Sequence, residues 1–180
     1  MTTGAAVAPG RGSGVAAVAA CDTITLVDIS AKTDYAIRAL AMLAEVQTTG
    51  GGALSAETLA ARQDLPRKFL EAILADLRRG GIVVSTRGAY GGYALARDAG
   101  DISLGAVFRV VSGPLAEVRG VRPQDVRYEG AAAHLPTVWV AVRASLRRVL
   151  DEVSLADLVA GDLPDHVRHL ADDPDAWANR

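Results

Sequence analysis

Apolar residues recur every three to four positions between residues 30 and 79, which predicts amphipathic helices in this part of the chain. The first helix is expected to run from Ser30, whose hydroxyl can cap it, to about Val46. Its predicted buried face consists of Ile37, Leu40, Leu43 and Ala44. A run of threonines and glycines over residues 48–52 then ends the helical pattern.

Two further helices with a tight turn between them are predicted next. The shorter helix begins after Ser55, a second capping residue, and ends near Arg62. After a turn at 63–65, the longer helix has Pro66 in its first turn and runs to Arg79. Its predicted buried face consists of Phe69, Leu70, Ile73, Leu74 and Leu77. This spacing is typical of a helix-turn-helix, but it also occurs in an ordinary corner between two helices.

The pattern changes from helical to alternating after the third helix. Residues 82–87 are rich in β-branched side chains, residues 88–92 form a glycine-rich turn, and residues 93–97 alternate, which predicts a β-hairpin. A β-hairpin directly after a helix-turn-helix makes a winged helix, and this favours the DNA-binding interpretation of the helices. The glycine spacing differs from that of nucleotide-binding loops, and no helix follows the turn.

A long helix with an apolar seam is predicted from Thr137 to Glu152. Apolar or small residues recur along it at Val138, Val142, Ser145, Val149 and Val153. Such a seam suits a partner helix from a second copy of the chain, although it could also pack on its own domain. Ser154 is expected to cap a last short helix, and residues 161–180 are expected to be an acidic, flexible tail without regular structure.

Charge is distributed unevenly along the 180 residues, although the net charge is only −2. Residues 62–97 carry seven basic and three acidic side chains, whereas residues 151–180 carry two basic and eight acidic ones. A basic centre beside an acidic end is typical of a nucleic-acid reader, but ordinary solvated faces would give the same numbers. No apolar run approaches the roughly 18 to 20 residues of a membrane span, so no membrane partner is expected.

Residues 1–27 consist largely of small residues without periodicity, and we expect them to be a disordered extension. The run ending at Cys21 fits a lipoprotein cleavage site, but its apolar stretch of six residues is too short for a signal peptide. We therefore expect a cytoplasmic protein associated with the nucleoid. Alternatively, translation starts at Val27, in which case Cys21, the only cysteine, is not part of the native protein.

Three motifs in the expected order together resemble the Rrf2 family of bacterial transcription regulators. They are SAKTDYA at 30–36, RKFLEAIL at 67–74 and STRGAYGGYAL at 85–95. The likeness covers roughly residues 28–160. It implies a winged helix-turn-helix head, a homodimer and a partly palindromic operator in double-stranded DNA.

The resemblance also implies roles for individual residues. Lys68 and Glu71 are expected to read bases in the major groove, where a glutamate can accept a hydrogen bond from cytosine. Arg87 is expected to enter the minor groove, next to Gly88, whose lack of a side chain lets the backbone approach DNA. Independently of the resemblance, we expect Arg67 and Tyr90 to contact phosphates.

The chain departs from the family at its sensor. Many members hold an iron–sulfur cluster with three cysteines in the loop before the dimerisation helix, and here this loop, residues 112–136, contains none. Asp34 and His134 match ligand positions of some members, but they cannot hold such a cluster without thiolates. His166 and His169 lack a closed ligand set. We therefore predict no cofactor and no metal, with an unknown small molecule or protein as the candidate effector.

The sequence thus predicts a mainly α protein with a winged helix-turn-helix head at 28–111, which carries a two-stranded β wing. A former sensor loop at 112–136 follows, then a dimerisation helix and a short final helix at 137–160. Its predicted function is that of a sequence-specific repressor acting as a homodimer. No catalytic constellation can be assembled, so we expect no enzyme. The alternative is a winged helix that binds only protein.

Overall fold

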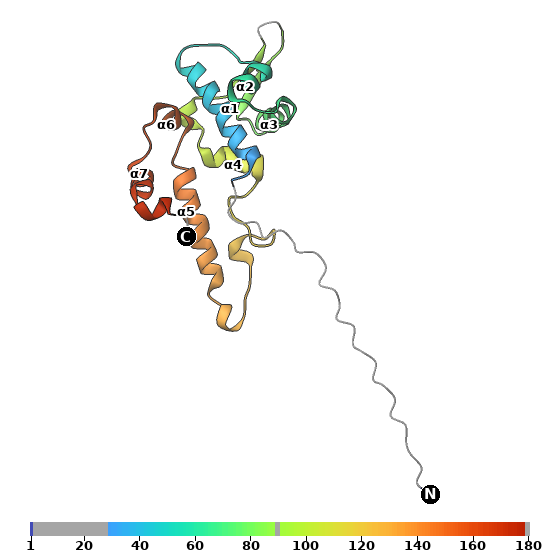
Figure 1. Cartoon of the computed structure of the whole chain (residues 1–180), viewed down its shortest axis with the longest axis vertical. Coiled ribbons are helices and arrows are strands. Elements are labelled where there is room, and N and C mark those ends of the chain that lie inside the picture. The colour runs from blue at the N-terminus through green and yellow to red at the C-terminus, as the bar shows by residue number, and fades with distance from the viewer. Residues whose placement is uncertain (2–28, 89–90, 179–180) are drawn as a thin grey trace.

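The computed structural model describes Met1, residues 29–88 and residues 91–178. In these ranges the chain forms a helical head with a two-stranded wing, and one long helix, α5, leads away from the head (Figure 1). The helices are α1 (Ala31–Thr48), α2 (Ala56–Gln63), α3 (Arg67–Arg79), α4 (Leu104–Ser112), α5 (Leu135–Leu150), α6 (Leu155–Ala160) and α7 (Asp165–Asp172). The strands are β1 (Val83–Thr86) and β2 (Gly92–Leu95), and the short 3-10 turns are η1 (Ala99–Asp101), η2 (Pro123–Asp125), η3 (Gly130–Ala132) and η4 (Pro174–Trp177). The predicted fold class, mainly α with a winged helix-turn-helix head and a long C-terminal helix, is confirmed.

Helix α1 is the centre of the head, and α3, α4, α6 and β2 all pack against it. Its start is fixed as predicted, because the backbone N–H of Thr33 donates to Ser30 Oγ at 3.2 Å. Ala36 and Ala39 are completely buried beside Leu40. Such small side chains let the surrounding helices approach the axis of α1 closely.

Helices α2 and α3 form the predicted helix-turn-helix. Ser55 caps α2, with Thr58 N donating to Ser55 Oγ at 3.0 Å. Helix α2 ends at Asp64, which adopts the left-handed conformation with φ of 51°. Pro66, expected in the first turn of α3, is instead the residue just before it, where its fixed φ still suits the start of a helix.

The buried face of α3 is confirmed for four of its five predicted residues. Leu70, Ile73, Leu74 and Leu77 are completely buried. The prediction is wrong for Phe69, whose side chain is 41% exposed. Phe69 lies at the edge of the apolar stripe, where its ring meets that of Tyr35 edge to face, with 5.8 Å between ring centres.

The wing is an antiparallel pair in which Val83 lies opposite Leu95 and Thr86 lies opposite Gly92. Both strands are shorter than the predicted 82–87 and 93–97. A bridge from Tyr93 to Leu54 adds two backbone hydrogen bonds, of 2.7 and 2.9 Å, and so ties the wing to the segment before α2. A side chain at residue 92 would lie 2.5 Å from the carbonyl oxygen of Leu54, so this junction requires glycine.

The chain returns to the head after α5. Leu104 N donates to Val153 O and Leu155 N donates to Ile102 O, both at 2.9 Å. The predicted cap of α6 is confirmed as a complete capping box of Ser154 and Asp157. Helix α5 itself begins and ends two residues earlier than predicted.

The C-terminal end of α5 is also joined to α4. Asp151 accepts from Arg109 of α4 at 2.8 Å and from Arg147 of α5 at 3.3 Å. Gly105 of α4 is buried against this junction, and a side chain there would collide with the Asp151 carboxylate. The absence of a Cβ at Gly105 therefore lets the end of α5 lie directly on the head.

The prediction that residues 161–180 lack regular structure is wrong for the described part of this segment. Helix α7 spans Asp165–Asp172, and η4 follows at Pro174–Trp177. Pro164 precedes the first turn of α7, where a proline is tolerated, and Asp165 supplies the negative charge that a helix start favours. No helix in the described residues is long and apolar enough to cross a membrane.

Candidate nucleic-acid interface

The first turn of α3 presents three predicted reading residues to solvent. Arg67, Lys68 and Glu71 are all exposed, because they lie on the side of α3 away from its buried leucines. Lys68 makes no ion pair within the described residues. This end of the helix therefore offers both a free ammonium group and a carboxylate to a ligand in front of it.

Arg67 connects the two helices of the helix-turn-helix. Its Nε donates to Glu71 Oε1 at 3.0 Å, and its Nη1 lies 3.5 Å from Glu57 Oε2 of α2. The hydrogen bond with Glu71, followed by the charges of Glu57 and Glu71, raises the pKa of Arg67 above its ordinary value. The role of Glu57 was not predicted from the sequence, although the sequence does place this residue in the first turn of the helix that Ser55 caps.

The wing carries a second set of predicted contacts. Arg87 is exposed and makes no ion pair within the described residues. Gly88 follows with a φ of 114°, which a residue with a side chain rarely adopts. Tyr90, the third predicted contact of the wing, lies outside the described residues.

The sequence analysis missed Arg78 as a member of this surface. It lies in the last turn of α3, and its Nη1 donates to Ser85 Oγ of β1 at 3.3 Å. Arg78 is exposed, so it links the helix and the wing on their solvent side. Only the spatial neighbourhood of α3 and β1 reveals this link, since the two residues belong to different elements.

Two contacts hold α3 and α2 on the central helix. Lys32 Nζ of α1 lies 2.7 Å from Asp76 of α3, which is also paired with Arg79. These hydrogen bonds, the one from Lys32 first, lower the pKa of the Asp76 carboxyl. Arg38 of α1 donates to the carbonyl oxygen of Gln63 and, at 3.1 Å, to Gln63 Oε1, which fixes the end of α2.

Helix α5 carries the predicted dimerisation residues and has no buried residue. Val138 is 51% exposed, Ser145 is exposed, and Val142 and Val149 are half-buried. Ser145 Oγ donates to the carbonyl oxygen of Ala141 at 3.1 Å, so its polar group is satisfied within the helix. These four residues therefore form an accessible seam along α5.

The loop before α5 has its own compact structure. A bridge between Val118 and Val121 closes a tight turn, in which Arg119 adopts a φ of 54°. The Arg119 guanidinium lies 6.0 Å from the centre of the Tyr128 ring, and η2 packs on α5 with Pro123 buried. Ser112, the last residue of α4, immediately precedes the loop, and its Oγ lies 2.7 Å from Thr33 Oγ1 in the first turn of α1.

A helix-turn-helix followed by an antiparallel wing defines a winged helix-turn-helix protein. The family model of Rrf2, described as an iron-dependent transcriptional regulator, matches residues 29–161. The chain belongs to the Rrf2 family, and it is a DNA-binding transcriptional regulator as the sequence predicts.

Relatives and solved structures agree with this assignment. A protein of Mycobacterium tuberculosis provisionally named an HTH-type transcriptional regulator is 46% identical over 145 residues, which cover 81% of this chain and 89% of the relative. The regulator CymR of Bacillus subtilis is 33% identical over 132 residues, 73% of this chain and 89% of CymR. All are named as regulators rather than enzymes.

The CymR structure, titled as the global cysteine regulator of Bacillus subtilis, superimposes with a TM-score of 0.64 at 31% identity. It covers 76% of this chain and 98% of CymR. The structure of IscR of T. potens superimposes with a TM-score of 0.59 at 31% identity and covers 85% of this chain and 93% of IscR. The fold of the head and of the long helix is therefore that of known regulators.

The residues of this chain do not fit an iron–sulfur cluster. Such clusters are held by thiolates, and residues 112–136 contain no cysteine. Asp34 lies 3.5 Å from the Arg38 guanidinium, and His134 is an exposed residue at the start of α5. Within the described residues, no three His, Cys, Asp or Glu side chains come together to hold a metal ion. Cys21 lies outside these residues.

Proposed function

We propose that this regulator is a sequence-specific repressor that binds a partly palindromic operator as a homodimer and works without an iron–sulfur cluster. The observation that carries the proposal is that α3 has an exposed first turn and packs against the exposed wing, to which Arg78 in its last turn is hydrogen-bonded. A recognition helix of this kind enters the major groove by its N-terminal end, while an adjacent arginine can reach the minor groove.

Base reading is assigned to Lys68 and Glu71. Arg67 holds one oxygen of Glu71 at 3.0 Å, which leaves the other carboxylate oxygen to accept from the amino group of a cytosine. Lys68, which has no ion-pair partner within the described residues, can donate to a guanine. Arg87 and Gly88 are assigned to the minor groove, and Arg67 and Tyr90 to phosphates.

The homodimer is assigned to the seam of Val138, Val142, Ser145 and Val149. The accessibility of the seam in the single chain supports this assignment, because an apolar helix face without a partner is unfavourable in water. Two copies related by a twofold axis would present two recognition helices, which is why a palindromic operator is expected. We propose that the protein represses by occupying its operator in the cytoplasm.

The signal is assigned to the loop of residues 112–136. The loop follows directly on Ser112, the last residue of α4, whose hydrogen bond with Thr33 joins α4 to α1, and α1 is the helix on which the reading elements pack. A small molecule or a protein that moved the loop would therefore act on the head through α1.

Selection of bound sequences from a random DNA pool tests the proposal. The wild-type chain should enrich a sequence with twofold symmetry and bind it far more tightly than random DNA, with affinity that falls steeply with salt. Glu71→Ala should enrich a different sequence, whereas Glu129→Ala, an exposed glutamate in the loop, should enrich the wild-type one. A chain that binds no DNA at low salt but copurifies with another protein would favour an interaction module instead.

A further inference from the structure

The segment formed by α7 and η4, residues 162–177, exposes large apolar side chains. We name it the C-terminal arm. It lies beyond residues 29–161, which the family model matches. Leu170 is 58% exposed and Trp177 is 79% exposed, and none of the residues of α7 is buried. A tryptophan and a leucine in this setting indicate a surface that another molecule covers.

The arm is nevertheless held in a defined place. His166 Nε2 lies 3.0 Å from the carbonyl oxygen of Arg148 and 3.4 Å from Glu152, which attaches the arm to the end of α5. At its far end, Trp177 Nε1 donates to the carbonyl oxygen of Ala171 at 2.5 Å. The Trp177 ring is thus tied to the arm by its polar atom while its apolar surface faces solvent.

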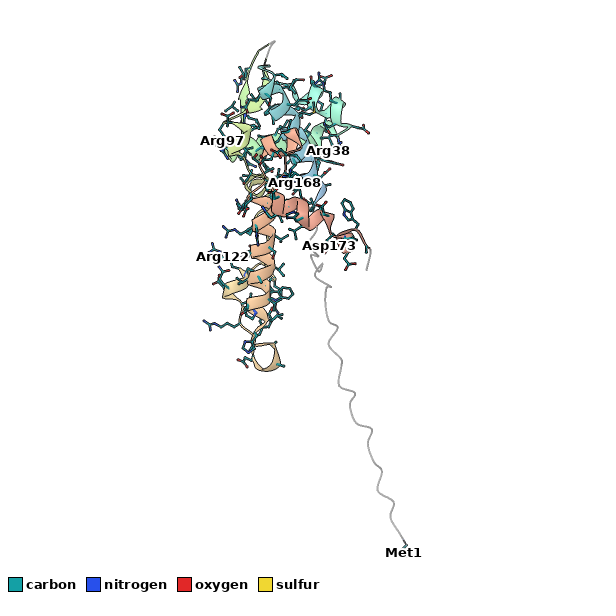
Figure 2. The ribbon with its side chains drawn as sticks, turned by 90° about the vertical axis from the view of Figure 1, so that its left-hand side faces the viewer. Met1, Arg38, Arg97, Arg122, Arg168 and Asp173 are labelled. Atoms are coloured by element: carbon teal, nitrogen blue, oxygen red, sulfur yellow. The ribbon has the colours of Figure 1, made fainter. Side chains whose placement is uncertain are left out.

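The arm and the sensor loop lie on different sides of α5. Figure 2 shows Arg122 of the loop on one side of this helix and Asp173 of the arm on the other. Exposed positions that recur every three to four residues along α5 are Thr137, Val138, Ala141, Ala144, Ser145 and Arg148. Arg148 belongs to this exposed set and also provides the carbonyl to which the arm is attached. We call these six exposed positions the free face of α5. The arm is therefore attached at the C-terminal end of this face.

The charges of the arm and of α5 are complementary. The arm carries Asp162, Asp165, Asp172 and Asp173, and of these Arg168 pairs with Asp162 and Asp165. Helix α5 carries three arginines and no acidic residue. Arg148 lies on the exposed face of α5 and makes no ion pair within the described residues. An acidic arm on one chain can therefore meet a basic helix on another.

We propose that the C-terminal arm is a contact surface for a second copy of this chain, with Leu170 and Trp177 packing against the free face of the partner's α5. The inference rests on the homodimer of the proposed function and extends its interface beyond the helix seam. Twofold symmetry makes the contact twice per dimer, so each substitution in the arm acts twice. Exposed tryptophan is the residue type that most often dominates such contacts.

The test compares dimer dissociation constants by sedimentation velocity on the full chain. The double variant Leu170→Asp/Trp177→Asp should raise the dissociation constant at least about tenfold. Val121→Asp, which places one negative charge on an exposed apolar residue of the sensor loop, should leave the dissociation constant unchanged. Because no residue of α7 is buried, the double variant and the wild type should unfold at the same temperature when both are monomeric, below the dimer dissociation constant of the wild type.

Tryptophan fluorescence provides a second readout that does not disturb the arm. The chain has two tryptophans, so Trp139→Phe leaves Trp177 as the only tryptophan. Its emission should move to shorter wavelength as the protein concentration rises through the dimer dissociation constant, and added salt should reverse the shift.

The results that would contradict the arm contact differ from the result that would contradict the homodimer. An unchanged dissociation constant for the double variant, or Trp177 emission that is identical in monomer and dimer, would overturn the arm contact and leave the homodimer intact. A wild-type chain that stays monomeric at every concentration and on its operator would overturn both.

Discussion

Arg67 donates from Nε to Glu71 Oε1 at 3.0 Å, one helical turn further along α3. The arginine thus neutralises the carboxylate that is assigned to base reading, which otherwise would be repelled by the phosphates of DNA. The pair is exposed, and exposed ion pairs contribute little to stability because water screens them. The side chains can therefore rearrange on DNA at little cost, with Arg67 turning to a phosphate and Glu71 to a base.

Replacing Glu71 by alanine should relax the base preference at one operator position. The lost hydrogen bond to a cytosine corresponds to about 1–3 kcal/mol of discrimination, or roughly 5- to 150-fold in relative affinity. Competition binding with operators substituted at each position measures this effect. Equal discrimination by the variant and the wild type at every position would contradict the role of Glu71.

Replacing Arg87 by alanine should weaken binding most at operators with A·T-rich flanks, because an arginine in a narrow minor groove reads its strong negative potential. Arg127→Ala, at an exposed arginine of the sensor loop, is the matched control and should bind as the wild type does. Similar losses on A·T-rich and G·C-rich flanks would argue against a minor-groove position.

The neighbouring residues Phe69 and Leu70 should differ sharply in their contribution to stability. Leu70→Ala removes a completely buried side chain and should lower the free energy of unfolding by about 2–5 kcal/mol. Phe69→Ala removes a side chain that is already 41% exposed and should cost clearly less. Urea unfolding of both variants measures the difference, and equal losses would show that Phe69 is a core residue after all.

Replacing Gly92 by alanine should detach the wing from the segment before α2. The new Cβ would lie 2.5 Å from the Leu54 carbonyl oxygen, so the two bridging hydrogen bonds must break or shift. DNA affinity should fall while the helical circular dichroism signal persists. Gly100→Ala is the control, because a Cβ there meets no atom within 4 Å. Unimpaired DNA binding by the Gly92 variant would show that the wing needs no such anchor.

The ion pair of Lys32 with Asp76 should make stability depend on acid pH. The pKa of the Asp76 carboxyl is lowered in the folded chain. The ion pair therefore stabilises the fold at pH values above the unfolded pKa of about 3.9, and this stabilisation is lost as the pH falls below that value. Asp76→Asn should therefore be less stable than the wild type at neutral pH, and the two stabilities should converge only as the pH falls through the lowered pKa of Asp76. Denaturant unfolding across this range tests it, and a constant difference would assign the effect to packing.

Local chemistry made much of the head predictable. Ser30, Ser55 and Ser154 cap helices through bonds to residues three positions away, so their role can be read from sequence alone. The exposure of Phe69 could not be read in this way, because it depends on Tyr35 of another helix. Helix α7 was missed because prolines and aspartates suggest a loop, whereas its place is fixed by a contact of His166 with a carbonyl 18 residues away.

The candidate site was predictable to a similar extent. The exposed residues at the start of α3 and in the wing follow from helical and strand periodicity, and so does the i,i+4 pair of Arg67 and Glu71. The links from Arg67 to Glu57 and from Arg78 to Ser85 join different elements. These links depend on how the elements pack, so they cannot be predicted from residue spacing along the chain.

The end of α5 is fastened to the head by the Asp151–Arg109 pair, by the close approach at Gly105 and by the backbone bonds of Leu104 and Leu155. For two copies joined through α5, the distance between their recognition helices would then be a fixed length of protein rather than an adjustable linker. Such a dimer binds only half-sites at one separation and one helical phase. Inserting a base pair between the half-sites would both increase their separation and rotate one relative to the other about the DNA axis.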